Sequence, residues 1–217
     1  LLHAYLRRRR GRGLGNSVSS GKGQMAIDLQ KINIKFYLAE DTVLSPEDAF
    51  RIFSQWIPET PDETLIDVAD YQHVPQGPKT VLVGHEANYS FDNTDGRYGL
   101  LYRQKAAASG PNTDRLKSAL VATLRACDRL ERGADATAKA RFVGAEAVVV
   151  INDRLCAAND DDALDEIRGD LDAVLDQLYA GASTQIQREG DELQRLSIRV
   201  RAEGDFDTQA LLSNLDV

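Results

Sequence analysis

The chain has 217 residues, of which 42% are apolar and 28% charged, and its formal net charge is −8. These values predict one soluble globular domain and exclude a wholly disordered or collagen-like chain, and no apolar run approaches the roughly 20 residues of a membrane-spanning helix. The two cysteines, Cys127 and Cys156, are too few for a disulfide framework or a four-cysteine zinc site, so we expect a reducing, cytoplasmic setting.

The first 24 residues differ in composition from the rest of the chain. They hold six basic residues and no acidic residue, so the other 193 residues carry a formal charge of −14. Glycines, serines and the lack of apolar periodicity predict that residues 1–24 are a disordered basic segment. We expect the native protein to begin at Met25, with the segment arising from cloning or an upstream reading frame. An organelle transit segment and an arm for an acidic surface or nucleic acid are the alternatives.

The patterned sequence begins with a strand and a helix. Apolar and polar residues alternate over 32–38, which predicts a half-buried strand. Ser45 is a suitable N-cap for a helix over about 46–57, where apolar residues recur at helical spacing. A short strand over 65–69 and a loop over 73–78 follow.

The middle of the chain is predicted to be a β-meander followed by a long helix. Strand patterns occupy 80–85 and 98–102, and residues 93–96 have the composition of a hairpin turn. An amphipathic pattern then predicts a helix over about 111–132, with Cys127 on its apolar stripe.

The last third of the chain is predicted to contain two hairpins around a helix. Residues 141–143 and 147–151 read as strands joined by a turn at 144–146. A helix over about 160–179 follows, and then a second hairpin over 184–202.

This order of elements favours an α+β fold with a mainly antiparallel sheet of hairpins and about three helices packed on it. Strands and helices do not alternate strictly enough for a parallel doubly wound sheet. We expect a single domain over 25–203, followed by a short, partly frayed C-terminal tail over 204–217.

The densest set of potentially reactive side chains lies at two neighbouring strand ends. It consists of Asp67, Asp70, His73, His85 and Glu86. If they converge, Asp67, Asp70, His73 and His85 could bind a divalent metal, or His85, Glu86 and Asp70 could act in acid–base chemistry. No complete metal-binding motif is present, and the same side chains can cap strand ends and face solvent. We favour this structural interpretation and expect no cofactor, with a divalent metal as the alternative.

Basic residues recur at alternate positions of the first and last predicted strands. They are Lys31, Lys35, Arg195, Arg199 and Arg201, with Tyr37 beside them. If these strands are neighbours, the sheet has a basic face, on which Lys35, Arg199 and Arg201 are the candidate partner-binding residues. Alternatively, the basic side chains protect edge strands and pair with nearby acids. Nucleic-acid binding is disfavoured because the acidic body repels phosphate backbones.

The sequence lacks the common catalytic and nucleotide-binding motifs. Residues 84–90 contain a histidine and a serine but not the small-x-Ser-x-small pattern of a hydrolase nucleophile elbow. No P-loop is present, and no glycine fingerprint follows a strand into a helix.

Four segments of the chain, taken together, resemble other proteins. They are Leu65-Ile66-Asp67-Val68-Ala69-Asp70-Tyr71, Val81-Leu82-Val83-Gly84-His85-Glu86, Leu100-Leu101-Tyr102 and Ile151-Asn152-Asp153-Arg154-Leu155. With these segments the chain resembles a group of small bacterial proteins that have no assigned activity, over about residues 32–200. The resemblance implies a start near Met25 and a bacterial cytoplasmic setting, and it implies no catalytic residues.

From the sequence we therefore expect a non-enzymatic accessory or protein-interaction module that binds a partner protein or a second copy of itself. The alternative is a metal-dependent or acid–base enzyme, hydrolase-like, built on the cluster from Asp67 to Glu86. A membrane partner is not expected, because the sequence has no membrane-spanning segment.

Overall fold

The structure, a computed structural model, describes residues 27–134 and 139–216. These residues form four helices and one eight-stranded antiparallel sheet, which confirms the predicted α+β class with one helix more than expected. The predicted basic segment over 1–24 and the expected start at Met25 lie outside the described residues. No helix in the described ranges is long and apolar enough to cross a membrane.

The sheet places the first strand of the chain near its centre. The strands lie in the order β2 (Leu65–Asp70), β3 (Pro78–Gly84), β4 (Ala87–Asp92), β5 (Gly99–Gln104), β1 (Ile32–Leu38), β6 (Phe142–Ile151), β8 (Leu196–Ala202) and β7 (Thr184–Glu189). Because β1 pairs with β5 on one side and with β6 on the other, it joins the two halves of the chain into one sheet.

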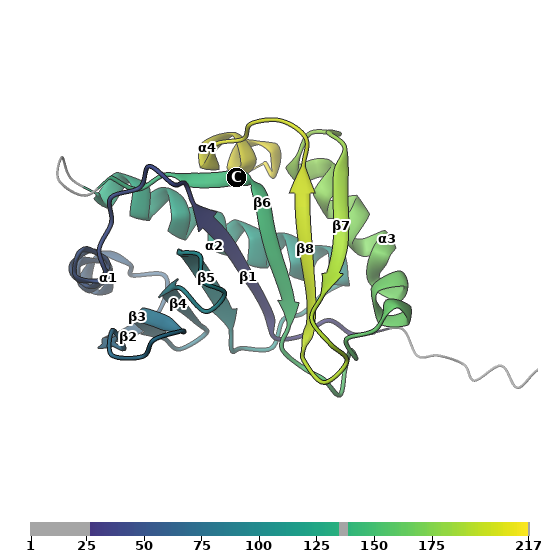
Figure 1. Cartoon of the computed structure of the whole chain (residues 1–217), viewed down its shortest axis with the longest axis horizontal. Helices are drawn as coiled ribbons and strands as arrows, with labels where there is room; N and C mark the ends of the chain where they lie inside the picture. The colour runs from purple at the N-terminus through teal and green to yellow at the C-terminus, as the bar shows by residue number, and fades with distance from the viewer. Residues whose placement is uncertain (1–26, 135–138, 217) are drawn as a thin grey trace, which may run out of the picture.

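The helices pack on one face of this sheet. They are α1 (Pro46–Glu59), α2 (Asn112–Gly133), α3 (Asp161–Leu178) and α4 (Thr208–Asn214). In Figure 1, α2 and α3 lie behind β1, β6, β8 and β7. Apolar side chains of the helices and of one strand face form a single core, which includes Trp56, Leu120, Ile34 and Ile198. Burial of this apolar surface is the main stabilising contribution. The opposite side of the sheet is called the helix-free face below.

Local sequence explains where the first helix begins. The Ser45 hydroxyl accepts a hydrogen bond from the backbone N–H of Asp48, and the Asp48 carboxylate accepts one from the backbone N–H of Ser45. Pro46 fits the first turn because that position has no helical partner for an N–H group. The three predicted helices are confirmed, and their ends differ from the predicted ones by at most two residues.

The hairpin predicted within β6 is wrong, because β6 is one continuous strand. Residues 144–146, expected as the turn, form a bulge. Phe36 of β1 pairs with Ala147, and the next residue, Tyr37, pairs with Val143, so the three residues between these pairs have no partner on β1.

A close packing contact explains the glycine that suggested a turn there. A Cβ atom on Gly144 would lie 2.2 Å from the backbone oxygen of Phe206. The glycine is therefore required for the close approach of the C-terminal segment to β6, and not for a reversal of the chain.

Strand β4 was not predicted, because its polar residues obscure the alternation. Its core-facing residues Ala87, Tyr89 and Phe91 are buried, but Ser90 and Asp92 on the helix-free face are buried as well. The predicted turn over 93–96 joins β4 to β5, and Gly96 there has φ +78°.

The C-terminal residues are not a frayed tail, since they form α4 and pack on the core. The Asp207 side chain accepts a hydrogen bond from the backbone N–H of Ala210 and begins the helix. Leu211 and Leu215 are fully buried, and the ring of Phe206 packs edge-on against Tyr179. The spacing of only two leucines over one short helix is too weak a periodic signal to predict this packing from sequence.

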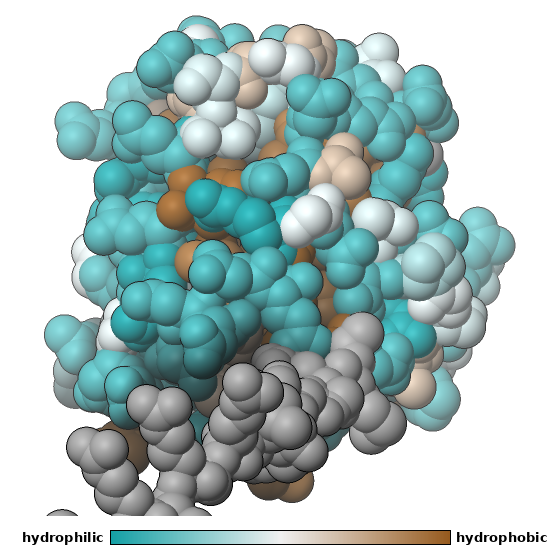
Figure 2. All heavy atoms as spheres, turned by 90° about the vertical axis from the view of Figure 1, so that its right-hand side faces the viewer, coloured by the Kyte–Doolittle hydropathy of each residue, from teal (hydrophilic) through white to brown (hydrophobic). Residues whose placement is uncertain are grey.

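Strand β7 is an edge of the sheet, and its exposed positions are polar. Gln185 and Gln187 are exposed, while Ile186 between them packs against the core. Figure 2 views the molecule from the side of β7 and α3 and shows a mostly hydrophilic surface crossed by a narrow hydrophobic strip. Polar side chains of this kind protect an edge strand against pairing with other chains.

Candidate functional site

Alternate residues of β1 point away from the helices and form the floor of a cleft. These residues, Asn33, Lys35 and Tyr37, are buried although they lie on the helix-free face. The cleft has a volume of about 770 Å³, and its walls come from β5, β6, β8 and loops at both ends of the sheet. This volume lies in the range of clefts that bind small ligands or single side chains of a partner.

Lys35 is the most buried charge in the cleft. Its Nζ atom donates hydrogen bonds to Asp92 at 2.8 Å, to Asp95 at 2.6 Å and to the backbone oxygen of Arg97 at 2.8 Å. The side chains of Lys35 and Asp92 are only 7% and 1% exposed. All three ammonium protons are used, so Lys35 holds the β4–β5 turn in place.

Tyr37 connects Lys35 to the arginines of the cleft. Its hydroxyl donates to the Asp95 carboxylate and accepts a hydrogen bond from Arg199 at 3.2 Å, and the guanidinium of Arg97 lies 3.8 Å from the ring centre. Burial and the Asp95 carboxylate raise the pKa of Tyr37 well above its ordinary value. Partial burial alone would raise the pKa of Asp95, but its hydrogen bonds from Lys35 and Tyr37 outweigh this effect and lower it.

The bulge in β6 brings Glu146 among three arginines. Its carboxylate accepts hydrogen bonds from Arg199 at 2.6 Å, Arg97 at 3.0 Å and Arg201 at 3.3 Å. Partial burial opposes ionisation, but the bonds from Arg199 and Arg97 prevail, so the pKa of Glu146 lies below its ordinary value. Arg199 also binds Glu189, which raises the pKa of its guanidinium further.

These side chains form two ion-pair clusters, which the hydrogen bonds of Tyr37 join into one charge-balanced ion-pair network. Its members are Lys35, Arg97, Arg199, Arg201, Asp92, Asp95, Glu146 and Glu189. The three candidate partner-binding residues therefore meet on one face. The first and last strands are not neighbours, however, because β6 lies between them. Arg201 is the most accessible of the three, with a side chain 54% exposed, whereas Lys35 and Arg199 are largely buried.

Two residues beside the network were missed by the sequence analysis. Arg103 of β5 is the cross-strand neighbour of Asn33 and lines the cleft, and it makes no ion pair with any described residue. The Oδ1 atom of Asn33 is buried and accepts no hydrogen bond from any residue in 27–134 or 139–216. A buried acceptor without a partner is costly, so it marks a position where a ligand could complete the structure. Alternation in β1 could have placed Asn33 on this face, but no local signal shows that its amide is unpaired.

The predicted catalytic and metal-binding cluster is spread along β2 and β3 and their loops. Asp67 lies opposite Val83 and Asp70 opposite Thr80, so Asp70 is at the far end of β3 from His85, roughly 16 Å away along the strand. All five side chains are exposed. Within the described ranges, no group of three or more His, Cys, Asp or Glu residues is arranged to hold a metal ion.

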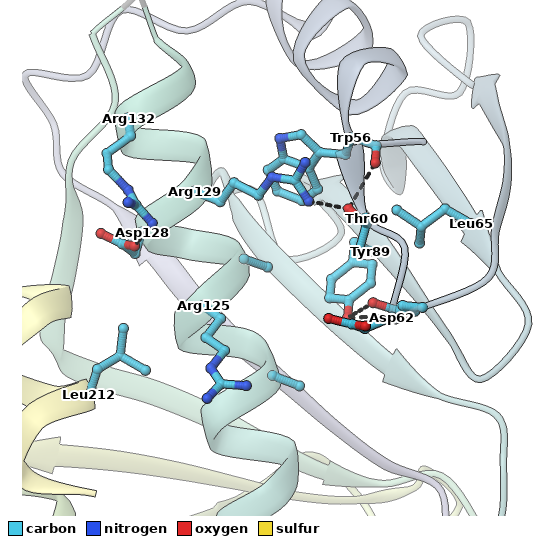
Figure 3. A pocket seen from close by; sticks show the side chains of 13 residues that line it. Trp56, Thr60, Asp62, Leu65, Tyr89, Arg125, Asp128, Arg129, Arg132 and Leu212 are labelled. Carbon is cyan, nitrogen blue, oxygen red and sulfur yellow. Dashed lines mark hydrogen bonds and ion pairs between the residues drawn. The ribbon is translucent and has the colours of Figure 1, made fainter. Parts of the chain in front are cut away.

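A second pocket, of about 620 Å³, lies on the helix side between α1 and α2 (Figure 3). Both oxygens of the Glu63 carboxylate accept from the Tyr89 hydroxyl, at 3.2 and 3.0 Å. The guanidinium of Arg129 covers Trp56 at 4.7 Å from the ring centre and donates to Thr60.

Titratable groups of this second pocket are shifted by burial. Burial raises the pKa of Glu63. The hydrogen bond from Tyr89 acts in the opposite direction, and the negative charge of Glu86 raises the pKa further. Burial and Glu63 together raise the pKa of Tyr89, and they raise that of Tyr102 to about 12. The pocket can therefore hold a protonated carboxyl group at higher pH than an exposed glutamate, but it offers no activated nucleophile among its lining residues.

No family model matches the chain, and no curated protein matches it. The similarity to small bacterial proteins inferred from the sequence therefore stays a prediction.

Proposed function

We propose that the protein is a non-enzymatic accessory module that binds a partner protein through the helix-free face of its sheet. The observation that carries this proposal is the cleft over β1. Its polar floor contains Asn33, a buried acceptor without a partner among the described residues, and its wall contains Arg103, a cation without a counter-ion among them. Rigid side chains lose little conformational entropy on binding, which favours recognition.

The chemistry of the cleft supports binding over catalysis. A general base or nucleophile needs a pKa near the working pH and a free lone pair. Here Lys35 donates all its protons and the pKa of Tyr37 is raised, while Asp95 and Glu146 are held ionised by cations. These groups serve to hold one another in place. A cytoplasmic location is part of the proposal and is supported by the two free cysteines.

The proposal is tested by two variants, each of which reverses the charge of one arginine, on opposite sides of the sheet. Arg103→Glu alters the helix-free face, and Arg125→Glu is the matched control, because Arg125 is an exposed arginine of α2 on the helix side. We expect partners captured from cell extract to be identified by mass spectrometry and then purified. The purified partner should bind Arg103→Glu at least about tenfold more weakly and Arg125→Glu as the wild type.

Equal binding of the purified partner to both variants would contradict the proposal. Light scattering on the wild-type protein alone tests the related possibility that the partner is a second copy of the chain. In that case Arg103→Glu should shift the dimer to monomer, and Arg125→Glu should not.

The metal-dependent alternative is tested separately by metal content and metal-induced thermal stabilisation. Because the four predicted ligands are exposed and Asp70 lies far from His85, we expect His73→Ala and His85→Ala to change neither quantity relative to the wild type. A bound divalent ion lost in both variants would instead favour the enzyme hypothesis.

A further inference from the structure

A row of cross-strand neighbours crosses the floor of the cleft at Asn33. Its partners in the row are Arg103 on β5 and Val150 on β6. One row further along, Leu101 and Val148 lie on the two sides of β1, and all five residues line the cleft. Side chains that lie opposite each other on one face of a sheet are about 5 Å apart at their Cβ atoms. The cleft therefore places an amide, a guanidinium and an apolar surface within reach of one small chemical group.

Asn33 and Arg103 leave hydrogen-bonding groups unused although they are neighbours. Asn33 is only 6% exposed, and its Oδ1 atom accepts no hydrogen bond within the described part of the chain. The guanidinium of Arg103 makes no hydrogen bond or ion pair to a described residue, so it can move to admit a donor to the amide oxygen. A group that bridges the two residues must contain an acceptor for the guanidinium and a donor for the amide oxygen.

The immediate neighbours of Arg103 on this face carry no negative charge. They are Asn33 and Asn88 on the adjacent strands, and Leu101 and Lys105 two positions away in the sequence. One guanidinium suffices for one carboxylate, which it can bind with two parallel hydrogen bonds. Recognition of a single carboxylate therefore requires no excess of positive charge on the face as a whole.

The C-terminal residue of a polypeptide contains this combination of groups. Its carboxylate is an acceptor for a guanidinium, its backbone N–H is a nearby donor, and its side chain is attached between them. Loops bound the cleft at both ends, with Asp95 in the β4–β5 turn at one end and Gln194 in the β7–β8 turn at the other. An extended segment that runs along the strands meets these loops, whereas a chain end can enter from above the sheet.

Resting on the proposed function, we propose that the cleft binds the free C-terminal residue of a partner protein, and that this residue is apolar. Its carboxylate pairs with Arg103, and its backbone N–H donates to the Oδ1 atom of Asn33. Its side chain packs on Leu101, Val148 and Val150.

Other occupants match these groups less well. An N-terminal ammonium group has no acceptor for Arg103 and would lie beside the ammonium group of Lys35. A nucleic-acid phosphate has no donor for the amide oxygen and no apolar side chain for the cleft wall. An internal aspartate or glutamate supplies a carboxylate, but its backbone must continue past the loops on both sides.

The experiment selects displayed random peptides of about ten residues with free C-termini, using the full chain as bait. We expect the enriched sequences to end in Val, Leu or Ile. Synthetic versions amidated at the C-terminus should bind at least about tenfold more weakly than the free acids. Arg103→Gln should weaken binding of the free acids by a similar factor but barely affect the amidated peptides, because the carboxylate and the guanidinium act as one pair. The control Arg125→Gln should bind both forms as the wild type does.

Asn33→Leu tests the second contact. We expect it to bind the free acids about three- to tenfold more weakly, because the acceptor for the backbone N–H is gone. The melting temperature of the unbound protein should stay the same or rise, since a buried acceptor without a partner in the described chain is removed. Unchanged peptide binding, or a lower melting temperature with full affinity, would overturn the role of Asn33 and with it the inference.

The remaining outcomes separate this inference from the proposed function. Equal binding of free and amidated peptides, or no enrichment of a common C-terminal residue, would overturn the inference. N-acetyl-leucine that binds as tightly as the peptides would also overturn it, because the cleft would then be a site for a small acylated amino acid. In each case, weaker binding of the purified partner to Arg103→Glu leaves the proposed function standing. Equal binding of that partner to Arg103→Glu and Arg125→Glu would overturn both.

Discussion

Lys35 shows at the scale of one residue how the helix-free face is held together. Lys35→Met removes the cation from a buried pair and leaves the carboxylate of Asp92, 1% exposed, without it. We expect a loss of about 3 kcal/mol in the free energy of unfolding, because an uncompensated buried charge is costly. Chemical denaturation measures it.

The matched control is Lys31→Met, since Lys31 pairs with Asp153 at 3.3 Å on the surface. That loss should stay below about 1 kcal/mol. The double variant Lys35→Met/Asp92→Asn should recover part of the stability, because the buried charge is gone as well. A Lys35→Met protein as stable as Lys31→Met would contradict the interpretation of the network.

Glu63 is the residue for which a pH dependence can be predicted. Its pKa is raised in the folded state, first by burial. The folded protein therefore binds this proton more tightly than the unfolded chain, so the associated stability is present below the ordinary carboxyl pKa and is lost as the pH rises through the folded value.

Glu63→Gln keeps a hydrogen-bonding partner for Tyr89 without the charge. We expect its melting temperature to exceed that of the wild type by no more than about 2 °C at about pH 7, and to show no gain at about pH 3.5. Glu203→Gln, at an exposed position, should match the wild type at both values. A larger gain in acid than at neutral pH would mean that the sign of the pKa shift is wrong.

At the scale of elements, the short helix α4 completes the core between α2 and β6. Leu211→Ala opens a cavity at a fully buried position and should cost about 2–4 kcal/mol of unfolding free energy. Ser213→Ala, on the exposed side of the same helix, should change it by less than about 0.5 kcal/mol. If both changes were equally mild in denaturant titrations, α4 would be a loosely attached tail after all.

At the scale of the whole molecule, the central position of β1 joins both halves of the chain into one cooperative unit. We expect a single thermal transition whose calorimetric and van 't Hoff enthalpies agree. Ile34→Ala in β1 and Ile198→Ala in β8 should each move this one transition, by about 3 kcal/mol of unfolding free energy, because both side chains belong to the same core. Two separate transitions in either variant would show that the halves unfold independently.

The three longer helices were predictable because their signals are local. The capping box of Ser45 and the apolar stripe of α2 lie within a few turns of the chain, where 3.6-residue periodicity and cap chemistry decide the conformation. Gly144 was misread for the opposite reason. Its role depends on Phe206, which is far away in sequence, and a glycine required for close packing has the same local signature as a glycine in a turn.

The candidate site was only partly predictable. The alternation of polar and apolar residues predicted that Lys35, Arg199 and Arg201 project from the polar side of their strands. In the structure they lie on the same face of the sheet. The separation of Asp70 from His85 could not be foreseen, since strand neighbours and register depend on contacts between distant segments.

The sequence by itself determined the α+β class, the positions of the three longer helices and the alternation of the strands, because each follows from residue spacing within one element. Only the tertiary structure decided that β6 separates the first and last strands and that its bulge turns Glu146 toward three arginines. It also decided that the Oδ1 atom of Asn33 has no partner in the described part of the chain and that Arg103, Arg154 and Arg195 line one cleft. These features depend on contacts between segments that are far apart in the sequence. Burial and charge compensation are properties of the assembled surface, which the chain acquires only when it folds.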